Sequence, residues 1–172
     1  MALQHTHTTT PFVTKKFPLV VLCDGVNSPA NAGGLFRICE AFGVDEIVFY
    51  NGNIDVHSSR LKRTARQTHK LVNYSVSHDI KETLRGFKKL EYDIIALEVS
   101  DISIPSEKIV LDKRSLVLII GNEQHGVSEE VLALTPKHMH IEMYGKNSSM
   151  NVVQASSIAL YTLVHKLNQL IE

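Results

Sequence analysis

The sequence has only two cysteines, no long apolar run and no excess of charge of either sign. Cys23 and Cys39 lack a metal-binding or redox spacing, and each lies in an apolar segment where a free thiol usually behaves as a small core hydrophobe. No apolar run approaches the length of a transmembrane helix, and the first ten residues lack the apolar core of a secretory signal. We therefore expect a cytoplasmic protein without membrane association or a bound metal.

Lys+Arg and Asp+Glu both total 18, so the molecule as a whole does not attract nucleic acid. Any contact with RNA must come from cations that are clustered locally. The densest cationic run lies between residues 60 and 70, and it also contains His69. Such a run is usually a solvated face, but here it is the best candidate for binding RNA phosphates. The proposed RNA-binding residues are Arg60, Lys62, Arg63, Arg66 and Lys70.

The length of 172 residues and the hydrophobic content of 44% fit one domain with a sizeable core. Residues 1–16 show no periodicity and are expected to form a flexible tail, followed by one domain over 17–172. Within that domain, short apolar runs alternate with helix-like segments, which predicts an α/β fold with a mainly parallel sheet flanked by helices. The expected strands cover residues 19–23, 46–50, 92–98, 115–120 and 138–142.

Two helices carry informative apolar patterns. Apolar residues at helical spacing between residues 31 and 42 predict an amphipathic helix packed on the sheet. The long C-terminal helix has an apolar stripe along one side, while Ile158 and Tyr161 fall on the other side. Apolar residues on both sides suggest two burial partners, so we expect the second partner to be another subunit in a homodimer.

The first motif runs from Asp24 to Arg37, from the end of the first strand into the first helix. On a helical projection, Arg37 lies opposite the apolar stripe of this helix and on nearly the same side as Gly33, one turn earlier. A glycine at that position would leave room for a ligand beside the guanidinium. The alternative is an ordinary solvated arginine, which is the norm for exposed arginines.

The second motif is a glycine loop, from Gly121 to Gly126, that follows an apolar strand and precedes a helix with Ser128 as its expected N-cap. The carboxyl end of a strand is where open α/β sheets bind ligands. Val127 stands where a phosphate-binding loop needs lysine, and the dinucleotide spacing is absent. Alone, the loop is equally well explained as an ordinary turn.

The third motif joins the last strand to the long helix, from Ile141 to Val152. Ser148 or Ser149 could cap that helix, and a capping role would account for these serines without a ligand. Asn151 is a candidate hydrogen-bond donor to a ligand.

In this order and spacing, the three motifs resemble the signature of the SpoU/TrmH family of RNA 2′-O-ribose methyltransferases in the SPOUT superfamily, over roughly residues 18–170. Two departures are Glu142, where a proline is usual, and Val153, where a serine is common. The matching residues are Asn31, Gly33 and Arg37 in the first motif, Gly121, Glu123 and Gly126 in the second, and Ile141, Met143, Gly145, Ser149, Met150, Asn151 and Val152 in the third.

The resemblance implies a C-terminal trefoil knot, S-adenosyl-L-methionine bound in the knotted loops, and an active site completed across a homodimer interface. It implies that Arg37, Asn31, Ser149 and Asn151 are catalytic, with Arg37 nearest the ribose hydroxyl. The implied cofactor-binding residues are Leu97, Gly121, Asn122, Glu123, Gly126, Ile141, Met143, Ser149, Met150 and Asn151.

The chemistry of arginine restricts the role of Arg37. A guanidinium is effectively always protonated in proteins, so Arg37 is better suited to binding a phosphate and stabilising negative charge than to acting as a base. Two alternatives remain open, an RNA base methyltransferase of the same superfamily and a non-catalytic RNA-binding or assembly protein on the same fold. Transfer RNA and ribosomal RNA are both open as substrates, with a slight preference for transfer RNA.

Overall fold

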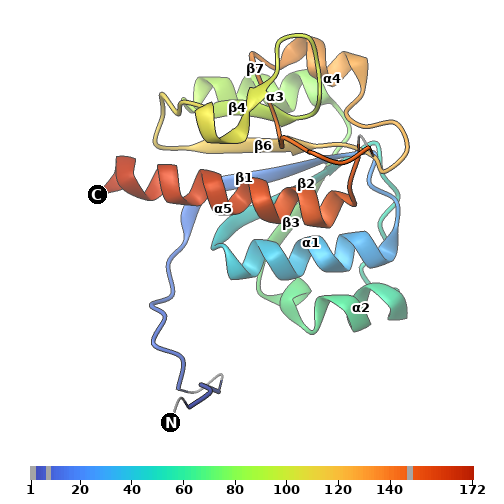
Figure 1. Cartoon of the computed structure of the whole chain (residues 1–172). Helices are drawn as coiled ribbons and strands as arrows, with labels where there is room; N and C mark the ends of the chain where they lie inside the picture. Colours follow the sequence, from blue (N-terminus) through green and yellow to red (C-terminus); the bar gives the residue numbers. More distant parts are fainter. Residues whose placement is uncertain (1–2, 7–8, 147–148) are drawn as a thin grey trace.

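A computed structural model describes residues 3–6, 9–146 and 149–172 (Figure 1). The chain forms a seven-stranded sheet in the order β3-β2-β1-β6-β4-β7-β5, and every pair of neighbouring strands in it is parallel. The elements are β1 (Phe17–Asp24), α1 (Pro29–Ala41), β2 (Val44–Tyr50), α2 (Ser59–Ala65), the 3-10 turn η1 (Thr68–Lys70), β3 (Asn73–Ser77), α3 (Ile80–Lys89), β4 (Asp93–Leu97), β5 (Ile104–Pro105), the 3-10 turn η2 (Ser106–Lys108), β6 (Leu116–Ile120), α4 (Glu129–Leu134), β7 (Lys137–His140) and α5 (Val152–Ile171).

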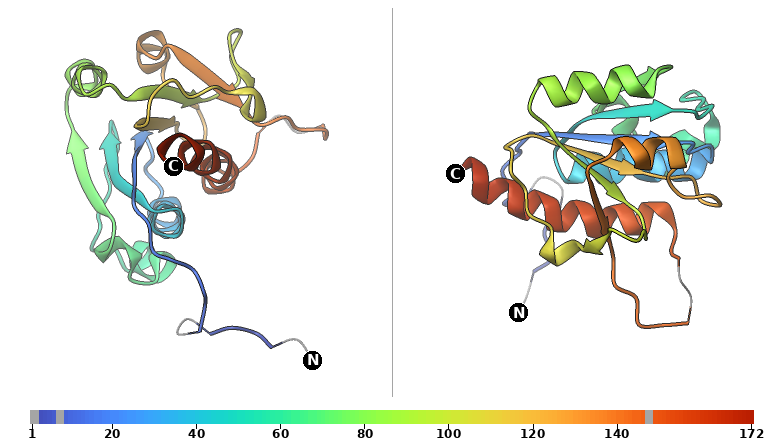
Figure 2. Two further views of the ribbon diagram at one scale, coloured as in Figure 1. Left: turned by 90° about the vertical axis from the view of Figure 1, so that its left-hand side faces the viewer. Right: turned by 90° about the horizontal axis from the view of Figure 1, so that it is seen from above.

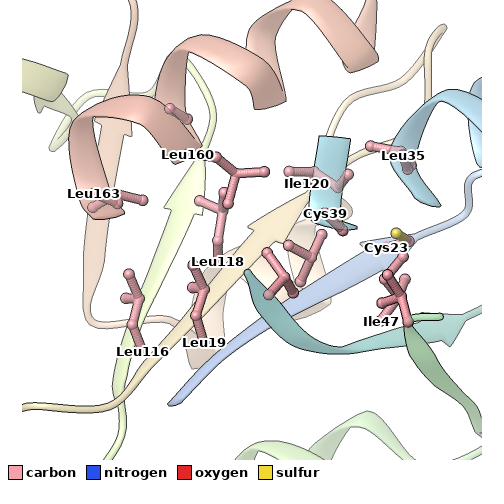
Figure 3. Close-up of a cluster of buried hydrophobic side chains, with 14 of the residues drawn as sticks. Leu19, Cys23, Leu35, Cys39, Ile47, Leu116, Leu118, Ile120, Leu160 and Leu163 are labelled. Carbon is pink, nitrogen blue, oxygen red and sulfur yellow. The ribbon is translucent and has the colours of Figure 1, made fainter. Parts of the chain in front are cut away.

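The sheet is covered on both faces, which explains why its central strands are apolar throughout. One face packs against α1 and α5, where Leu35, Leu160 and Leu163 meet side chains from β1 and β6 (Figure 3). The other face packs against α3 and α4 through Leu84 and Val131. Figure 2 shows this three-layer arrangement from two further sides, with residues 9–16 leading away from the layers.

The predicted α/β class, the five predicted strands and the amphipathic helix are confirmed, with ends shifted by a few residues. The last predicted strand ends earlier than expected, at His140 instead of Glu142. The pattern missed β3, because this edge strand exposes nearly all of its side chains, and it missed β5, because this strand has only two residues. Within the described part of the chain, no helix is long and apolar enough to cross a membrane.

A buried carboxylate fixes the connection into β6. Asp93 at the start of β4 is 6% exposed, and its Oδ2 accepts hydrogen bonds from the backbone N–H groups of Asp112 and Lys113 at 2.6 and 2.8 Å. Its Oδ1 accepts from Lys137 Nζ at 2.8 Å, which joins β4 to β7. Lys137 Nζ also lies 2.7 Å from Asp112 Oδ2. One acidic side chain therefore holds two strands and the segment that leads into a third.

Replacing Asp93 with alanine should lower the free energy of unfolding by about 3 kcal/mol, because three donors lose a charged acceptor in a buried position. The exposed Asp45, which makes no side-chain hydrogen bond or ion pair with the described residues, provides the control: Asp45→Ala should change stability by less than about 0.5 kcal/mol. Urea unfolding of both variants measures the difference. Equal stability of the two variants would contradict this role of Asp93.

Candidate active site

A pocket of about 370 Å³ opens at the carboxyl edge of the sheet. Its walls come from the segments that follow β4, β6 and β7 and from the start of α5, so parallel strand direction alone brings these segments together. All of the proposed cofactor-binding residues line it except Asn151. The lining residues are Leu97, Glu98, Val99, Ile120, Gly121, Asn122, Glu123, Gln124, His125, Gly126, His140, Ile141, Met143, Ser149, Met150, Val152 and Ala155.

The glycine loop after β6 closes on itself. The backbone N–H and C=O groups of Asn122 and Gly126 exchange two hydrogen bonds of 2.9 Å. A Cβ on Gly121 would lie 2.1 Å from the carbonyl carbon of Gly126, so Gly121 is required for this closure. The space beside Gly121 is filled by the backbone of Gly126 and Val127.

The loop is anchored by two carboxylates that the sequence analysis did not select. Asp24 at the end of β1 accepts from the N–H of Ser128 at 2.7 Å. Glu98, directly after β4, accepts from the N–H groups of Val99 and Val127, each at 2.9 Å, and so ties two walls of the pocket together. The available signal was position, because each acid stands at the carboxyl end of a predicted strand.

A chain of hydrogen bonds joins the three motifs. Asn151 Nδ2 donates to Asn31 Oδ1 at 3.1 Å, and Asn31 Nδ2 donates to Glu123 Oε1 at 2.5 Å. Asn31 lies in the first turn of α1 and Asn151 is the N-cap of α5, so the carboxylate of Glu123 binds a side chain at the N-terminus of α1 that is itself bound to the cap of α5. Negative charge near a helix N-terminus is stabilised by the helix dipole. The motif residues, which lie far apart in the sequence, thus form one unit at the pocket wall.

The cap of α5 differs from the expected one. Asn151 Oδ1 accepts from the N–H of Val153 at 2.9 Å, so Asn151 caps the helix and Ser149 does not. Ser148, the other expected cap, lies outside the described residues. Ser149 is exposed and lines the pocket.

Arg37 is exposed on α1 and makes no hydrogen bond or ion pair with the described residues. Arg37 lies about one helical turn after Gly33 and Gly34. Its side chain therefore points from α1 in a direction between those of the two glycine positions. A Cβ on Gly33 would lie 2.6 Å from the carbonyl oxygen of Leu61, and one on Gly34 would lie 2.9 Å from Val153 Cγ2. The two glycines therefore let α2 and α5 pack directly on α1. The expectation that Gly33 leaves room for a ligand was wrong, because α2 fills that room.

The proposed RNA-binding residues form a cationic cluster on α2, η1 and the turn between them. All are exposed, and none is in an ion pair with another described residue. His69 does not extend this cluster, because its ring packs edge-on against Phe36 and burial, with the charges of Lys70 and Lys62, lowers its pKa. The α2 cationic cluster consists of Arg60, Lys62, Arg63, Arg66 and Lys70.

The two departures from the family pattern lie away from the pocket lining. Glu142 is exposed, and its Oε2 accepts from the hydroxyl of Tyr144 at 3.4 Å. Val153 packs against Gly34 where α5 crosses α1. Glu142 therefore adds no carboxylate to the pocket, and Val153 affects packing.

The sequence profile of the SpoU rRNA Methylase family matches residues 18–161. The chain belongs to this family. A tRNA (guanosine(18)-2′-O)-methyltransferase of Aquifex aeolicus is 31% identical to it over 83% of this chain and 67% of that protein. The 23S rRNA (guanosine(2553)-2′-O)-methyltransferase RlmP of Bacillus subtilis is 28% identical over 84% of this chain and 57% of that protein.

Solved structures show the same fold. The SpoU methyltransferase AviRb of Streptomyces viridochromogenes, solved with the cofactor AdoMet, superposes with a TM-score of 0.78 at 22% identity, over 93% of this chain and 60% of that one. The predicted knotted SPOUT fold is confirmed. As a member of the family, the protein is an RNA 2′-O-methyltransferase.

The pocket fits S-adenosylmethionine, the cofactor that the family resemblance implies. Its volume is within the usual range for small-molecule sites, about 300–1,000 Å³. Apolar side chains such as Leu97 and Ile141 suit a purine, and the carboxylate of Glu123 suits a positively charged ligand. The segments around Leu97, Gly121, Ile141 and Met150 would hold the adenosine part.

Gly126→Ala should weaken binding of S-adenosylhomocysteine at least tenfold. Gly126 has φ +66°, and a Cβ would lie 2.2 Å from Glu98 Oε2, so the substitution strains the loop and displaces the carboxylate that joins two pocket walls. Gly86→Ala is the matched control, because a Cβ on this α3 residue would have no neighbour within 4 Å. Isothermal titration calorimetry measures both affinities, and unchanged binding by Gly126→Ala would contradict this account of the loop.

Proposed function

We propose that the protein methylates the ribose 2′-hydroxyl of a guanosine in an exposed loop of transfer RNA, with the pocket as its cofactor site and Arg37 at the acceptor. The hydrogen-bonded unit of Asn31, Glu123 and Asn151 carries this proposal, because it joins the pocket wall to the N-terminal end of Arg37's helix. The named relatives modify guanosine in transfer RNA or ribosomal RNA. A compact RNA loop suits the α2 cationic cluster, which lies at one corner of the domain.

The reaction breaks the bond between sulfur and the methyl carbon and forms a bond from that carbon to the 2′-oxygen, while the hydroxyl proton leaves. S-adenosylmethionine supplies an electrophilic sulfonium methyl group when bound. Arg37 remains protonated, so it binds the phosphate beside the acceptor ribose and stabilises the charge that develops on the 2′-oxygen. The proton passes to water or to an RNA phosphate oxygen. Catalysis then depends mainly on alignment of the two reactants.

The remaining motif residues serve that alignment. Asn31 and Asn151 hold each other and Glu123, so they fix the N-termini of α1 and α5 relative to the glycine loop. Ser149 lines the pocket and would supply a polar group near the methyl donor.

A homodimer would complete the site. Arg37 does not line the pocket of its own chain. On α5, Ile158 and Tyr161 are 42% and 60% exposed, on the side away from the buried Leu160 and Leu163. Burial of this apolar face by a second copy would explain its composition. Such a copy would bring a second α1, and with it a second Arg37, toward the pocket.

Arg37→Ala should reduce methyl transfer by on the order of 100-fold or more, because the variant cannot stabilise charge at the acceptor. Binding of S-adenosylhomocysteine should stay unchanged, since Arg37 is not a pocket residue. Arg37→Lys keeps the charge but not the bidentate geometry and should be intermediate. Transfer of radiolabelled methyl to transfer RNA gives the rates. An Arg37→Ala enzyme with full activity would exclude Arg37 from catalysis.

Tyr161→Glu should convert the dimer to monomers and reduce activity, because a carboxylate would enter an apolar interface. Leu90→Glu is the control, since Leu90 is also exposed, at 68%, but follows α3 on the opposite face of the sheet. Light scattering at micromolar concentration measures both masses. A monomeric wild-type protein would contradict the dimer.

Replacing Arg60, Lys62, Arg63 and Arg66 with glutamine should weaken RNA binding and reduce the slope of log affinity against log salt by roughly 0.9 for each phosphate that the variant no longer neutralises. Removing the same number of cations from α3, on the other face of the sheet, tests whether position matters. An unchanged salt slope in the first variant would rule out the α2 cationic cluster. The control residues are Lys81, Arg85, Lys88 and Lys89.

A further inference from the structure

His140 is the last residue of β7 and lines the pocket, and a serine holds its ring. Ser103 Oγ lies 2.9 Å from His140 Nδ1. The same oxygen accepts from the N–H of Ser100 at 3.0 Å and donates to the carbonyl oxygen of Ser100 at 2.8 Å. The histidine ring is therefore attached to the turn 100–103, which follows the pocket residues Glu98 and Val99.

The single hydroxyl proton of Ser103 governs the tautomer of His140. Ser103 Oγ donates this proton to the carbonyl oxygen of Ser100, which can only accept and which also accepts from the backbone N–H of Ser103 at 3.2 Å. In this arrangement Ser103 Oγ accepts from His140, and the ring carries its proton on Nδ1. In the neutral ring this leaves Nε2 with a free lone pair. Nε2 makes no hydrogen bond or ion pair with any residue in the described ranges.

The neighbouring His138 shows the opposite arrangement. Its Nδ1 lies 2.7 Å from Ser100 Oγ and its Nε2 lies 3.3 Å from the carbonyl oxygen of Leu132. Both ring nitrogens are engaged and the residue is 6% exposed, so His138 has a structural role. Both histidines lie on β7 and each contacts a serine. Of the two, only His140 has an unused acceptor that faces the pocket.

We propose that His140 determines cofactor specificity, with Nε2 accepting a hydrogen bond from a donor on the adenosine part of S-adenosylmethionine. The positively charged part of the ligand would bind more favourably near the carboxylate of Glu123. His140 Nε2, as a neutral acceptor, suits a neutral donor instead. Adenosine has such donors in its amino group and its ribose hydroxyls. This inference rests on the proposed placement of the cofactor in this pocket.

Calorimetry with S-adenosylhomocysteine tests the hydrogen bond without methyl transfer. His140→Phe should bind roughly tenfold more weakly than wild type, His140→Gln should recover part of the affinity through its amide oxygen, and the exposed His78→Phe should bind normally. Equal affinities of wild type and His140→Phe would overturn the role of His140 alone. A wild-type protein that binds no S-adenosylhomocysteine would instead remove the cofactor assignment on which the inference rests.

The tautomer can be measured independently in the ligand-free protein. Long-range ¹H–¹⁵N correlation spectra should show the His140 proton on Nδ1, with the signal identified by its disappearance in His140→Phe. Ser103→Ala removes the acceptor and should increase the population protonated on Nε2, which a merely structural serine would not do. A wild-type ring protonated on Nε2 would overturn the proposal. Repeating the titrations with S-inosylhomocysteine, which lacks the amino group, separates that donor from the hydroxyls: the effect of His140→Phe vanishes in the first case and persists in the second.

Discussion

The common direction of the strands is the constraint on which the site depends. Because β1, β4, β6 and β7 are parallel, the segments that follow them all emerge at one edge of the sheet. Asp24, Glu98 and the glycine loop meet there, and hydrogen bonds from the N–H groups of Val127 and Ser128, directly after the loop, to the two carboxylates hold the loop in place. No single segment has a ligand site of its own. The pocket arises where the ends of β4, β6 and β7 and the start of α5 converge.

The helices connect this edge of the sheet to the proposed RNA-binding surface. Gly33 and Gly34 bring α2 and α5 into direct contact with α1, so the α2 cationic cluster, Arg37 and the start of α5 belong to one packed layer. The unit of Asn31, Glu123 and Asn151 then links that layer to the pocket. The same contacts would then set the positions of the proposed cofactor and of the proposed RNA phosphate, as an in-line transfer between two separate reactants requires.

Much of this arrangement could be predicted from the sequence, because buried strands and amphipathic helices leave strong apolar patterns. The exposed β3 and the short β5 leave weak ones. The knot was predicted from family resemblance, since periodicity carries no information on threading. The roles of individual residues were harder to predict than the fold. Gly33 and Gly121 make room for neighbouring backbone, and α5 is capped by Asn151 instead of Ser149. These depend on contacts between distant segments, as does the Nδ1 contact of His140 with Ser103.

The most direct test is transfer of a tritiated methyl group from S-adenosylmethionine to separate pools of transfer RNA and ribosomal RNA, followed by nuclease digestion and identification of the labelled nucleoside. We expect 2′-O-methylguanosine from the transfer RNA pool. Label on a base, or label in neither pool together with no binding of S-adenosylhomocysteine, would contradict it.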